Sequence, residues 1–535
     1  MLHLLALALS TCIATVSADY TWPNPVWDEL EDLAHLQSGP LAYNVAQGIS
    51  PCDGFPQNPN PARQASSEWL RTAFHDAISH DAATGTGGMD ASLLFETERP
   101  ENLGGRSFND TFGFMSGHYS TRASMADLIA LATYTAVRNC GGPPISIRAG
   151  RIDATGPAPE GRVPEPKDST KKILKKFADA GFNQKDMIQM VACGHTLGGV
   201  HGEFFPELTG DPSPSNFARF DNTTARFDNK VVTEYLAGTT KNPLVTAPGG
   251  NNSDLRVFNS DGNSTMRAMS SPKAFLSTCG SILQRMIDTV PASVKLSPPL
   301  TPLTIKPFML QLQLLNTGNV QLSGYIRVKD DGKGQPKAVK LIYRDRQGKL
   351  AKTALTTSIA GDGQITAGPE GQFRFFDIGQ AVLPNGISGF NVSVTSASGV
   401  EKVYNNNGVG YPLQDTLIYQ QPQSCLVQQA DANGNWNLTM TAAVRTRKGL
   451  QNPVMSVAVQ SERPGTFVPL LTVTPVPMKL WRNTSSGYAL YTGTYAIAPA
   501  SWSTTVDLSV KGPDSQTFED GFKRTDVLTE TCAGF

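Results

Sequence analysis

The spacing of apolar residues changes once along this chain, and that change constrains the fold more than any other feature. Before about residue 290 apolar residues recur at helical spacing, as in MADLIALATYTAVRNCGG and SPKAFLSTCGSILQRMIDTV. After the Pro-rich stretch 293–307, short segments such as WNLTMTAAVRT and TTVDLSVKG alternate apolar and polar residues. A chain of 535 residues is too long for one core. We therefore predict a multi-domain protein, mostly α and then all-β.

The predicted boundaries follow the same change. A mostly α domain is expected over 19–295, and a Pro-rich linker over 296–307. Two β-sandwich-like modules are expected over 308–420 and 421–535, a division inferred from length and strand count.

The N-terminus predicts export from the cell. Residues 1–18 form an apolar run ending in Val16-Ser17-Ala18, the pattern of a signal peptide cleaved after Ala18. Cleavage removes Cys12 and leaves an even number of cysteines, which favours disulfides in a secreted chain. N-x-[ST] sequons agree with a secreted glycoprotein. The remaining cysteines are Cys52, Cys140, Cys193, Cys279, Cys425 and Cys532, and the sequons begin at Asn109, Asn222, Asn251, Asn263, Asn391, Asn437 and Asn483.

Composition excludes two classes of partner. The formal net charge is -1, which is not the basic balance of a nucleic-acid binder. No segment after the signal peptide holds about 18 consecutive apolar residues, so no membrane span is expected.

Two histidines stand in settings that suggest chemistry. In EWLRTAFHDAISH, Arg71 and His75 lie one helical turn apart on a shared face. His195 lies in ACGHTLGG, inside another predicted helix. Taken singly, each is more typical of a core histidine with a satisfied hydrogen bond.

The order of motifs changes this interpretation. RTAFHDA, GGMDASLLFE, MADLIALATYTAV, GRIDATGPAPEGRVPEP, ACGHTLGGVH and FDNTTARFDN follow one another between about Cys52 and Val290. Together they resemble the plant-type haem peroxidase superfamily, and most closely the fungal secretory (class II) peroxidases. The resemblance implies a secreted haem peroxidase domain over 19–295 that binds haem b and uses hydrogen peroxide to oxidise small phenolic or aromatic donors.

The resemblance assigns the residues above the haem. It implies that His75 is the acid–base group that moves the peroxide proton, since imidazole titrates near neutrality. It implies that Arg71 stabilises the negative charge that develops as the O–O bond breaks. Phe74 is expected to line the pocket. Asn102 is expected to orient His75, with Glu96 as its supporter.

Below the haem, His195 is expected to ligate the iron and a carboxylate to accept its other N–H. Asp254 is favoured for that carboxylate, and Asp261 remains the alternative. His201 is expected to be structural.

Two calcium sites are also implied, because carboxylates, carbonyls and hydroxyls suit a hard cation. The expected distal ligands are Asp76, Gly88, Asp90 and Ser92. The expected proximal ligands are Thr196, Asp221, Thr223, Arg226 through its carbonyl, and Asp228. Cys52–Cys140 and Cys193–Cys279 are candidate disulfides, although Cys193 departs from the class II pattern, and Cys425 and Cys532 bracket the last module.

Some positions depart from the family pattern. The manganese-binding acids of the relatives correspond to Gln64, Glu68 and Gly198, so we expect no manganese site. Phe220 stands where other relatives carry a tryptophan.

The β half lies outside the resemblance and could serve as a spacer, a docking surface or a binder of cell-wall polysaccharide. Trp436, Trp481 and Trp502 could stack on sugars, but the core interpretation is favoured. The alternative function is a catalytically inactive, peroxidase-like cell-wall or carbohydrate-binding protein.

Overall fold

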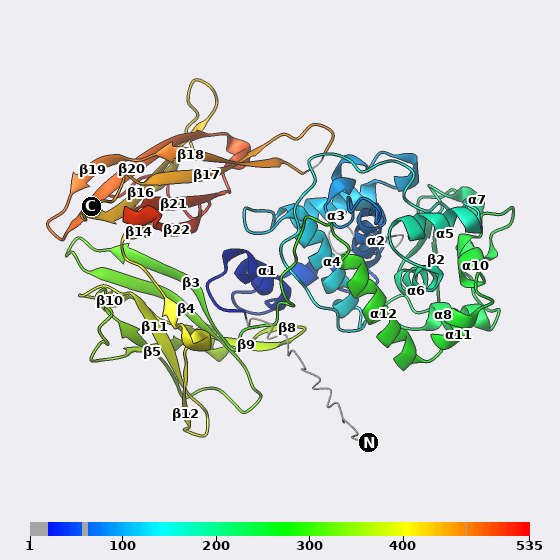
Figure 1. Ribbon diagram of the computed structural model, residues 1–535, viewed down its shortest axis with the longest axis horizontal. Coiled ribbons are helices and arrows are strands. Elements are labelled where there is room, and N and C mark those ends of the chain that lie inside the picture. Colours follow the sequence, from blue (N-terminus) through cyan, green and yellow to red (C-terminus); the bar gives the residue numbers. More distant parts are fainter. Residues whose placement is uncertain (1–19, 56–62, 467) are drawn as a thin grey trace, which may run out of the picture.

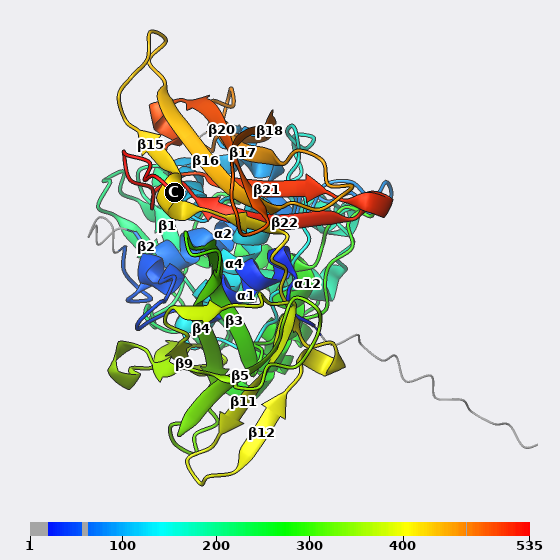
Figure 2. The ribbon, with the colours of Figure 1, turned by 90° about the vertical axis from the view of Figure 1, so that its left-hand side faces the viewer.

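The computed structural model describes residues 20–55, 63–466 and 468–535 (Figure 1). The expected signal peptide, with Cys12, lies outside the described residues. The helical part occupies one side of the molecule, and the β strands occupy the other. Figure 2 shows the two groups of strands one above the other. The predicted order, mostly α and then all-β, is confirmed.

Helices form at the segments predicted to be helical, and further helices form elsewhere in the first half of the chain. For example, α6 begins at a complete capping box, in which the Asn183 side chain accepts from the Asp186 amide and Asp186 accepts from the Asn183 amide. The helices are α1 (Pro25–His35), α2 (Ala65–Ala77), α3 (Arg106–Ser116), α4 (Met125–Asn139), α5 (Thr170–Asp179), α6 (Gln184–Gly194), α7 (Pro206–Thr209), α8 (Lys230–Leu236), α9 (Pro243–Thr246), α10 (Ser253–Phe258), α11 (Ser264–Ala268) and α12 (Pro272–Ile287). A ribbon of β1 (Gly199–His201) and β2 (Phe217–Arg219) follows α6.

The first β module is built from two antiparallel sheets. One contains β10-β4-β9-β7 with β3 and β8 attached, and the other contains β12-β11-β5-β6 with β13 attached. Their strands are β3 (Ile305–Leu314), β4 (Val320–Lys329), β5 (Ala338–Arg344), β6 (Leu355–Thr356), β7 (Ser358–Ile359), β8 (Thr366–Gly368), β9 (Gly371–Asp377), β10 (Ala381–Leu383), β11 (Gly389–Thr395), β12 (Glu401–Tyr404) and β13 (Tyr411–Pro412).

The second β module has the same plan. One sheet contains β14-β16-β20-β19 with β15 attached, and the other contains β18-β17-β21-β22. Its strands are β14 (Leu417–Tyr419), β15 (Cys425–Val427), β16 (Trp436–Arg445), β17 (Val454–Ser461), β18 (Leu470–Pro477), β19 (Lys479–Asn483), β20 (Tyr488–Ile497), β21 (Thr505–Lys511) and β22 (Thr517–Arg524).

Two edges differ from the expected boundaries. Strand β3 begins at Ile305, inside the expected linker, because Lys306 is drawn into a buried cluster of charges. Strand β14 pairs with β16 and so belongs to the second module, although 417–419 was expected in the first. Trp481 and Trp502 are 44% and 42% exposed, so the core interpretation of these two residues is wrong.

Within the described residues, disulfides join Cys52 to Cys140, Cys193 to Cys279, and Cys425 to Cys532. The first two lie in the helical part, and the third brackets the second β module. Among the described residues, no helix is long and apolar enough to cross a bilayer.

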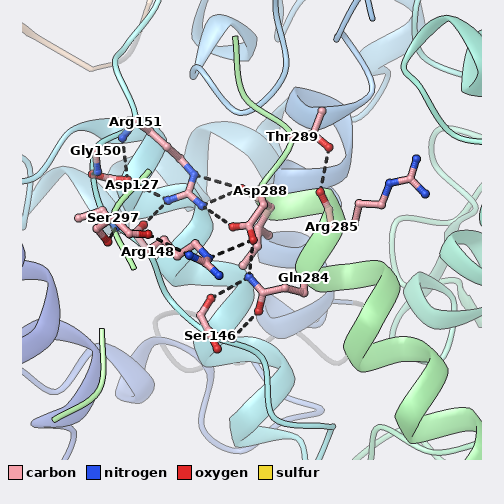
Figure 3. A network of polar contacts seen from close by, with 12 residues as sticks. Asp127, Ser146, Arg148, Gly150, Arg151, Gln284, Arg285, Asp288, Thr289 and Ser297 are labelled. Carbon is pink, nitrogen blue, oxygen red and sulfur yellow. Dashed lines mark hydrogen bonds and ion pairs between the residues drawn. The ribbon is translucent and has the colours of Figure 1, made fainter. Parts of the chain in front are cut away.

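A buried polar network fixes α4 against α12 (Figure 3). The fully buried guanidinium of Arg151 lies 2.9 Å from Asp127 of α4 and donates to the Ile287 carbonyl at the end of α12. Gln284 of α12 accepts from the Ser146 amide at 2.6 Å and donates to the Ser146 carbonyl at 3.1 Å. These bonds tie α12 to α4 and to the segment that follows α4.

A second buried cluster joins the helical part to the first β module. Glu31 and Asp32 of α1 face Lys306 of β3 and Arg327 of β4. The Lys306 Nζ lies 2.7 Å from Glu31 and 2.8 Å from Asp32, and Arg327 lies 2.5 Å and 2.6 Å from the same two carboxylates. All four residues are buried.

Candidate active site

A cavity of about 480 Å³ lies between α2 and the end of α6. Arg71, Phe74 and His75 of α2 line one side, and His195 lines the other, with Asp254 behind it. Apolar side chains complete the walls; they include Phe177, Met190, Val191, Leu197, Phe220 and Leu244. The structure therefore brings the two histidine motifs, 120 residues apart in the chain, to one cavity.

His75 is held by a chain of two hydrogen bonds. Its Nδ1 lies 2.7 Å from Asn102 Oδ1, and the Asn102 Nδ2 donates to the Glu96 backbone carbonyl at 2.9 Å. The Glu96 carboxylate is used elsewhere, because it accepts from the Ala158 amide. Burial and then the nearby Arg71 charge hold the pKa of His75 well below its usual value. The imidazole is therefore neutral and able to accept a proton at neutral pH.

Arg71 is positioned by the segment after Asn102. Its guanidinium donates to Ser107 Oγ and to the Leu103 carbonyl, both at 2.9 Å, and lies over the Phe108 ring. Burial lowers the pKa of Arg71 to about 10, so the side chain stays charged at neutral pH. Ser107 and Leu103 were not singled out from the sequence, because a backbone carbonyl and a serine carry no recognisable pattern.

On the opposite side, His195 ends α6 and pairs with a buried carboxylate. Its Nδ1 lies 2.8 Å from Asp254 Oδ2, and Asn242 donates to the same oxygen at 2.8 Å. The Phe220 ring stacks on the imidazole at 4.1 Å. Asp261, the alternative partner, instead accepts from the amide and hydroxyl of Thr265 at the start of α11.

These residues fit a haem. With Nδ1 of His195 donating to Asp254, Nε2 is the nitrogen left to bind a metal. The walls of the cavity are largely apolar, as a porphyrin requires. The charged and basic groups Arg71 and His75 come from α2, whereas His195 lies at the end of α6.

His201 lines the same cavity and was expected to be only structural. Its ring stacks on Phe217 at 4.6 Å. Burial, followed by the charges of Arg63 and Arg71, lowers its pKa to about 4. His201 lies on β1, six residues after His195, and only the course of this short ribbon turns it toward the cavity.

The expected distal calcium ligands lie beside the end of α2. Asp76 accepts from the amides of Ala91 and Leu93, while Asp90 accepts from the amide of Ser92. Burial and then the Asp90 carboxylate hold the pKa of Asp76 well above its usual value. The buried Ser92 hydroxyl has no hydrogen-bond partner among the described residues. Gly88 lies in the same loop.

The expected proximal ligands gather next to His195. Thr223 donates to Asp228 at 2.9 Å, and Thr196 donates to the Asp228 carbonyl at 2.6 Å. Burial raises the pKa of Asp221 to about 7, and its Oδ2 has no partner within the described chain. Arg226 is exposed in the same loop. Over the described ranges, no group of three or more His, Cys, Asp or Glu side chains is placed to hold a metal ion.

Comparison with known proteins decides the family. The family model described as peroxidase matches residues 56–272. A WSC domain-containing protein of Arthroderma benhamiae is 37% identical over 100% of this chain and 71% of its own length. The chain contains a peroxidase domain. Its peroxidase domain lies in the helical half and is of the plant-type haem peroxidase superfamily.

Other relatives match about a third of the chain. Manganese peroxidase H4 of Phanerodontia chrysosporium is 37% identical over 36% of this chain and 48% of its own length. Versatile peroxidase VPS1 of Pleurotus eryngii is 33% identical over 32% of this chain and 46% of its own. The chain thus spans about half the length of these peroxidases, and the β half extends beyond the match.

Proposed function

We propose that this protein is a secreted haem peroxidase that uses hydrogen peroxide to oxidise small phenolic or aromatic donors. The observation that carries the proposal is the pairing of His75 and Arg71 on one side of a cavity with His195 and Asp254 on the other. A bound haem b would supply the iron at which peroxide binds and the redox chemistry of the reaction.

The chain's own residues would manage protons and charge. Because Asn102 Oδ1 accepts the Nδ1–H of His75, the lone pair of Nε2 is free to take a proton from peroxide. The same nitrogen returns the proton to the leaving oxygen, so that water departs. Arg71 stabilises the negative charge on that oxygen. Asp254 keeps Nδ1 of His195 protonated and the ring basic.

The reducing donor is proposed to be organic rather than manganese. Gln64, at one of the three positions that correspond to manganese ligands, is a neutral amide, and Gly198 has no side chain. The remaining acid, Glu68, is paired with Arg63 at 2.6 Å. A divalent cation would have to compete with this pair for the carboxylate.

Two calcium ions complete the proposal, one at Asp76, Gly88, Asp90 and Ser92 and one at Thr196, Asp221, Thr223, Arg226 and Asp228. The buried, unpartnered Ser92 and Asp221 oxygens support it. Chelation should lower the melting temperature, and calcium should restore it. An unchanged melting temperature would refute the two sites.

Secretion is proposed from the signal-peptide pattern of residues 1–18, and the sequence of the exported protein should begin at Asp19.

Exposed Trp481 and Trp502 support a polysaccharide partner for the second β module. Replacing both with alanine should reduce binding to insoluble glucan; unchanged binding would argue against that partner.

The decisive experiment is a visible spectrum during haem addition and then peroxide titration. A Soret band that changes with one equivalent of peroxide is expected. No Soret band would exclude the peroxidase and favour the inactive, peroxidase-like alternative.

A further inference from the structure

Gln64 precedes α2 and is completely buried, yet its side chain does not cap the helix. Its Oε1 accepts from the Gly198 amide at 3.1 Å and from Arg219 Nη1 at 2.6 Å. Its Nε2 donates to the carbonyls of Cys52 at 3.0 Å and Thr224 at 3.1 Å. An amide side chain has two N–H donors and one oxygen with two lone pairs, so this one is fully used.

Three of the partners of Gln64 belong to segments that are linked to His195 along the chain or by packing. Gly198 follows that histidine by three residues. Arg219 precedes Phe220, whose ring stacks on the His195 imidazole. Thr224 lies in the loop that carries the proximal oxygen cluster. One glutamine on the His75 side therefore bonds three separate segments on the His195 side.

The contact at Gly198 is too tight for a larger residue. A Cβ atom there would lie 2.7 Å from the Cβ of Ser67 in the first turn of α2, and its φ of +91° favours glycine. The Gly198 carbonyl also accepts from the Phe220 amide at 3.2 Å. The backbone after His195 is thus pressed against the helix that carries Arg71 and bonded to its N-terminal residue.

We infer that Gln64 is a positioning residue that fixes the two walls of the cavity relative to each other. Arg71 and His75 lie further along the helix that Gln64 precedes, and His195 lies three residues before Gly198. A rigid helix transmits the position of its first turn to these side chains. The inference rests on the proposed function, since the walls matter as the two faces of a haem site.

The test compares Gln64→Leu, Gln64→Glu and Gln284→Leu. Gln284 also bonds backbone in both directions, but it belongs to the network of Figure 3 and not to the residues that line the cavity. Hydrogen exchange of the apoprotein reports on the Gly198 amide. In Gln64→Leu, exchange over 195–201 should be about tenfold faster, the change expected from losing one hydrogen bond. Gln64→Glu keeps an acceptor and should retain most of the protection.

The second readout is a Soret-monitored haem titration of the full chain. Gln64→Leu should bind haem about tenfold more weakly, the lower end of the effect expected from an outer-shell contact, with a shifted Soret maximum. Gln284→Leu should reduce thermal stability alone. The inference would be overturned if wild type and Gln64→Leu exchanged equally fast over 195–201. It would also be overturned if Gln64→Leu and Gln284→Leu bound haem with equal affinity. If Gln64→Leu does not fold, an unprotected 195–201 segment in folded Gln64→Glu, with unchanged haem affinity, would overturn it. A wild type without a Soret band would instead refute the proposed function, and the exchange result would still decide the role of Gln64.

Discussion

His75 Nδ1 and Asn102 Oδ1 lie 2.7 Å apart, and this pair sets the tautomer of the histidine. Asn102 must present Oδ1 to His75, because its Nδ2 donates to the Glu96 carbonyl. Asn102→Leu should therefore release the ring and slow the reaction with peroxide by about 10- to 100-fold while haem binding stays intact. Stopped-flow spectroscopy of the Soret band measures this rate. A wild-type rate would show that His75 needs no such support.

The same pair predicts a pH effect. In wild type, burial and Arg71 keep the pKa of His75 well below its usual value, so the free base persists as the pH falls. Asn102→Asp adds a negative charge beside the ring, which favours the imidazolium and raises this pKa. The rate should then be lost at a higher pH than in wild type, since only neutral His75 accepts the proton. Stopped-flow rates across the acid range test this, and an acid limb that does not move contradicts it.

Arg71 should speed the reaction with peroxide because its positive charge is held at a fixed position in the cavity. Arg71→Leu is expected to slow the peroxide reaction by about 10²- to 10³-fold, as loss of a preorganised donor does in other active sites. Arg106→Leu is the matched control, because Arg106 also lines the cavity but its side chain is 70% exposed. Comparable losses in both variants would indicate a general electrostatic effect instead of a placed cation.

The sequence predicted the helices and strands better than the boundaries between the domains. Helical spacing and alternation in the sequence identified α4, α6, α12, β16 and β21. The pairing of β14 with β16 was not predictable, because a three-residue strand carries no periodicity. The burial of Lys306 was also missed, because a lysine in a Pro-rich stretch is expected to be exposed to solvent. Only the folded structure brings the carboxylates of α1 to its side chain.

Some residues of the candidate site could be predicted from the sequence and others could not. Residues with strong chemistry in a recognisable order, such as His75 and His195, stand out in the sequence. His201 and Gln64 do not, because their roles depend on where a two-stranded ribbon folds. Asp254 and Asp261 each follow a serine, and only the packing of α10 against α6 brings one of them to His195.

That difference between the two aspartates can be measured. Asp254→Ala leaves the His195 Nδ1–H and the Asn242 amide without their acceptor, at a cost of about 1–3 kcal/mol each. It should also weaken haem binding by about 10- to 100-fold. Asp261→Ala should cost only the roughly 1 kcal/mol of a lost helix cap and leave haem affinity unchanged. Urea unfolding and haem titration provide both measurements, and a reversed order would assign the role to Asp261.

The buried charge cluster between α1 and the first β module should contribute to the free energy of unfolding of the whole chain. Arg327 is fully buried and contacts both Glu31 and Asp32. Arg327→Met should leave one carboxylate uncompensated, since Lys306 alone then faces both, and lower the free energy of unfolding by about 3–5 kcal/mol. Lys175→Ala, which breaks an exposed pair with Asp179, should cost less than about 1 kcal/mol.

A double variant separates lost charge balance from lost packing. Glu31→Gln removes one of the two carboxylates and leaves Lys306 facing the other, so the double variant should be more stable than Arg327→Met alone. Urea titrations followed by circular dichroism measure all four proteins. If Arg327→Met unfolds within about 1 kcal/mol of wild type, or if Glu31→Gln adds its full separate cost, the cluster does not couple the two halves through charge, and apolar contacts of α1 must hold them together instead.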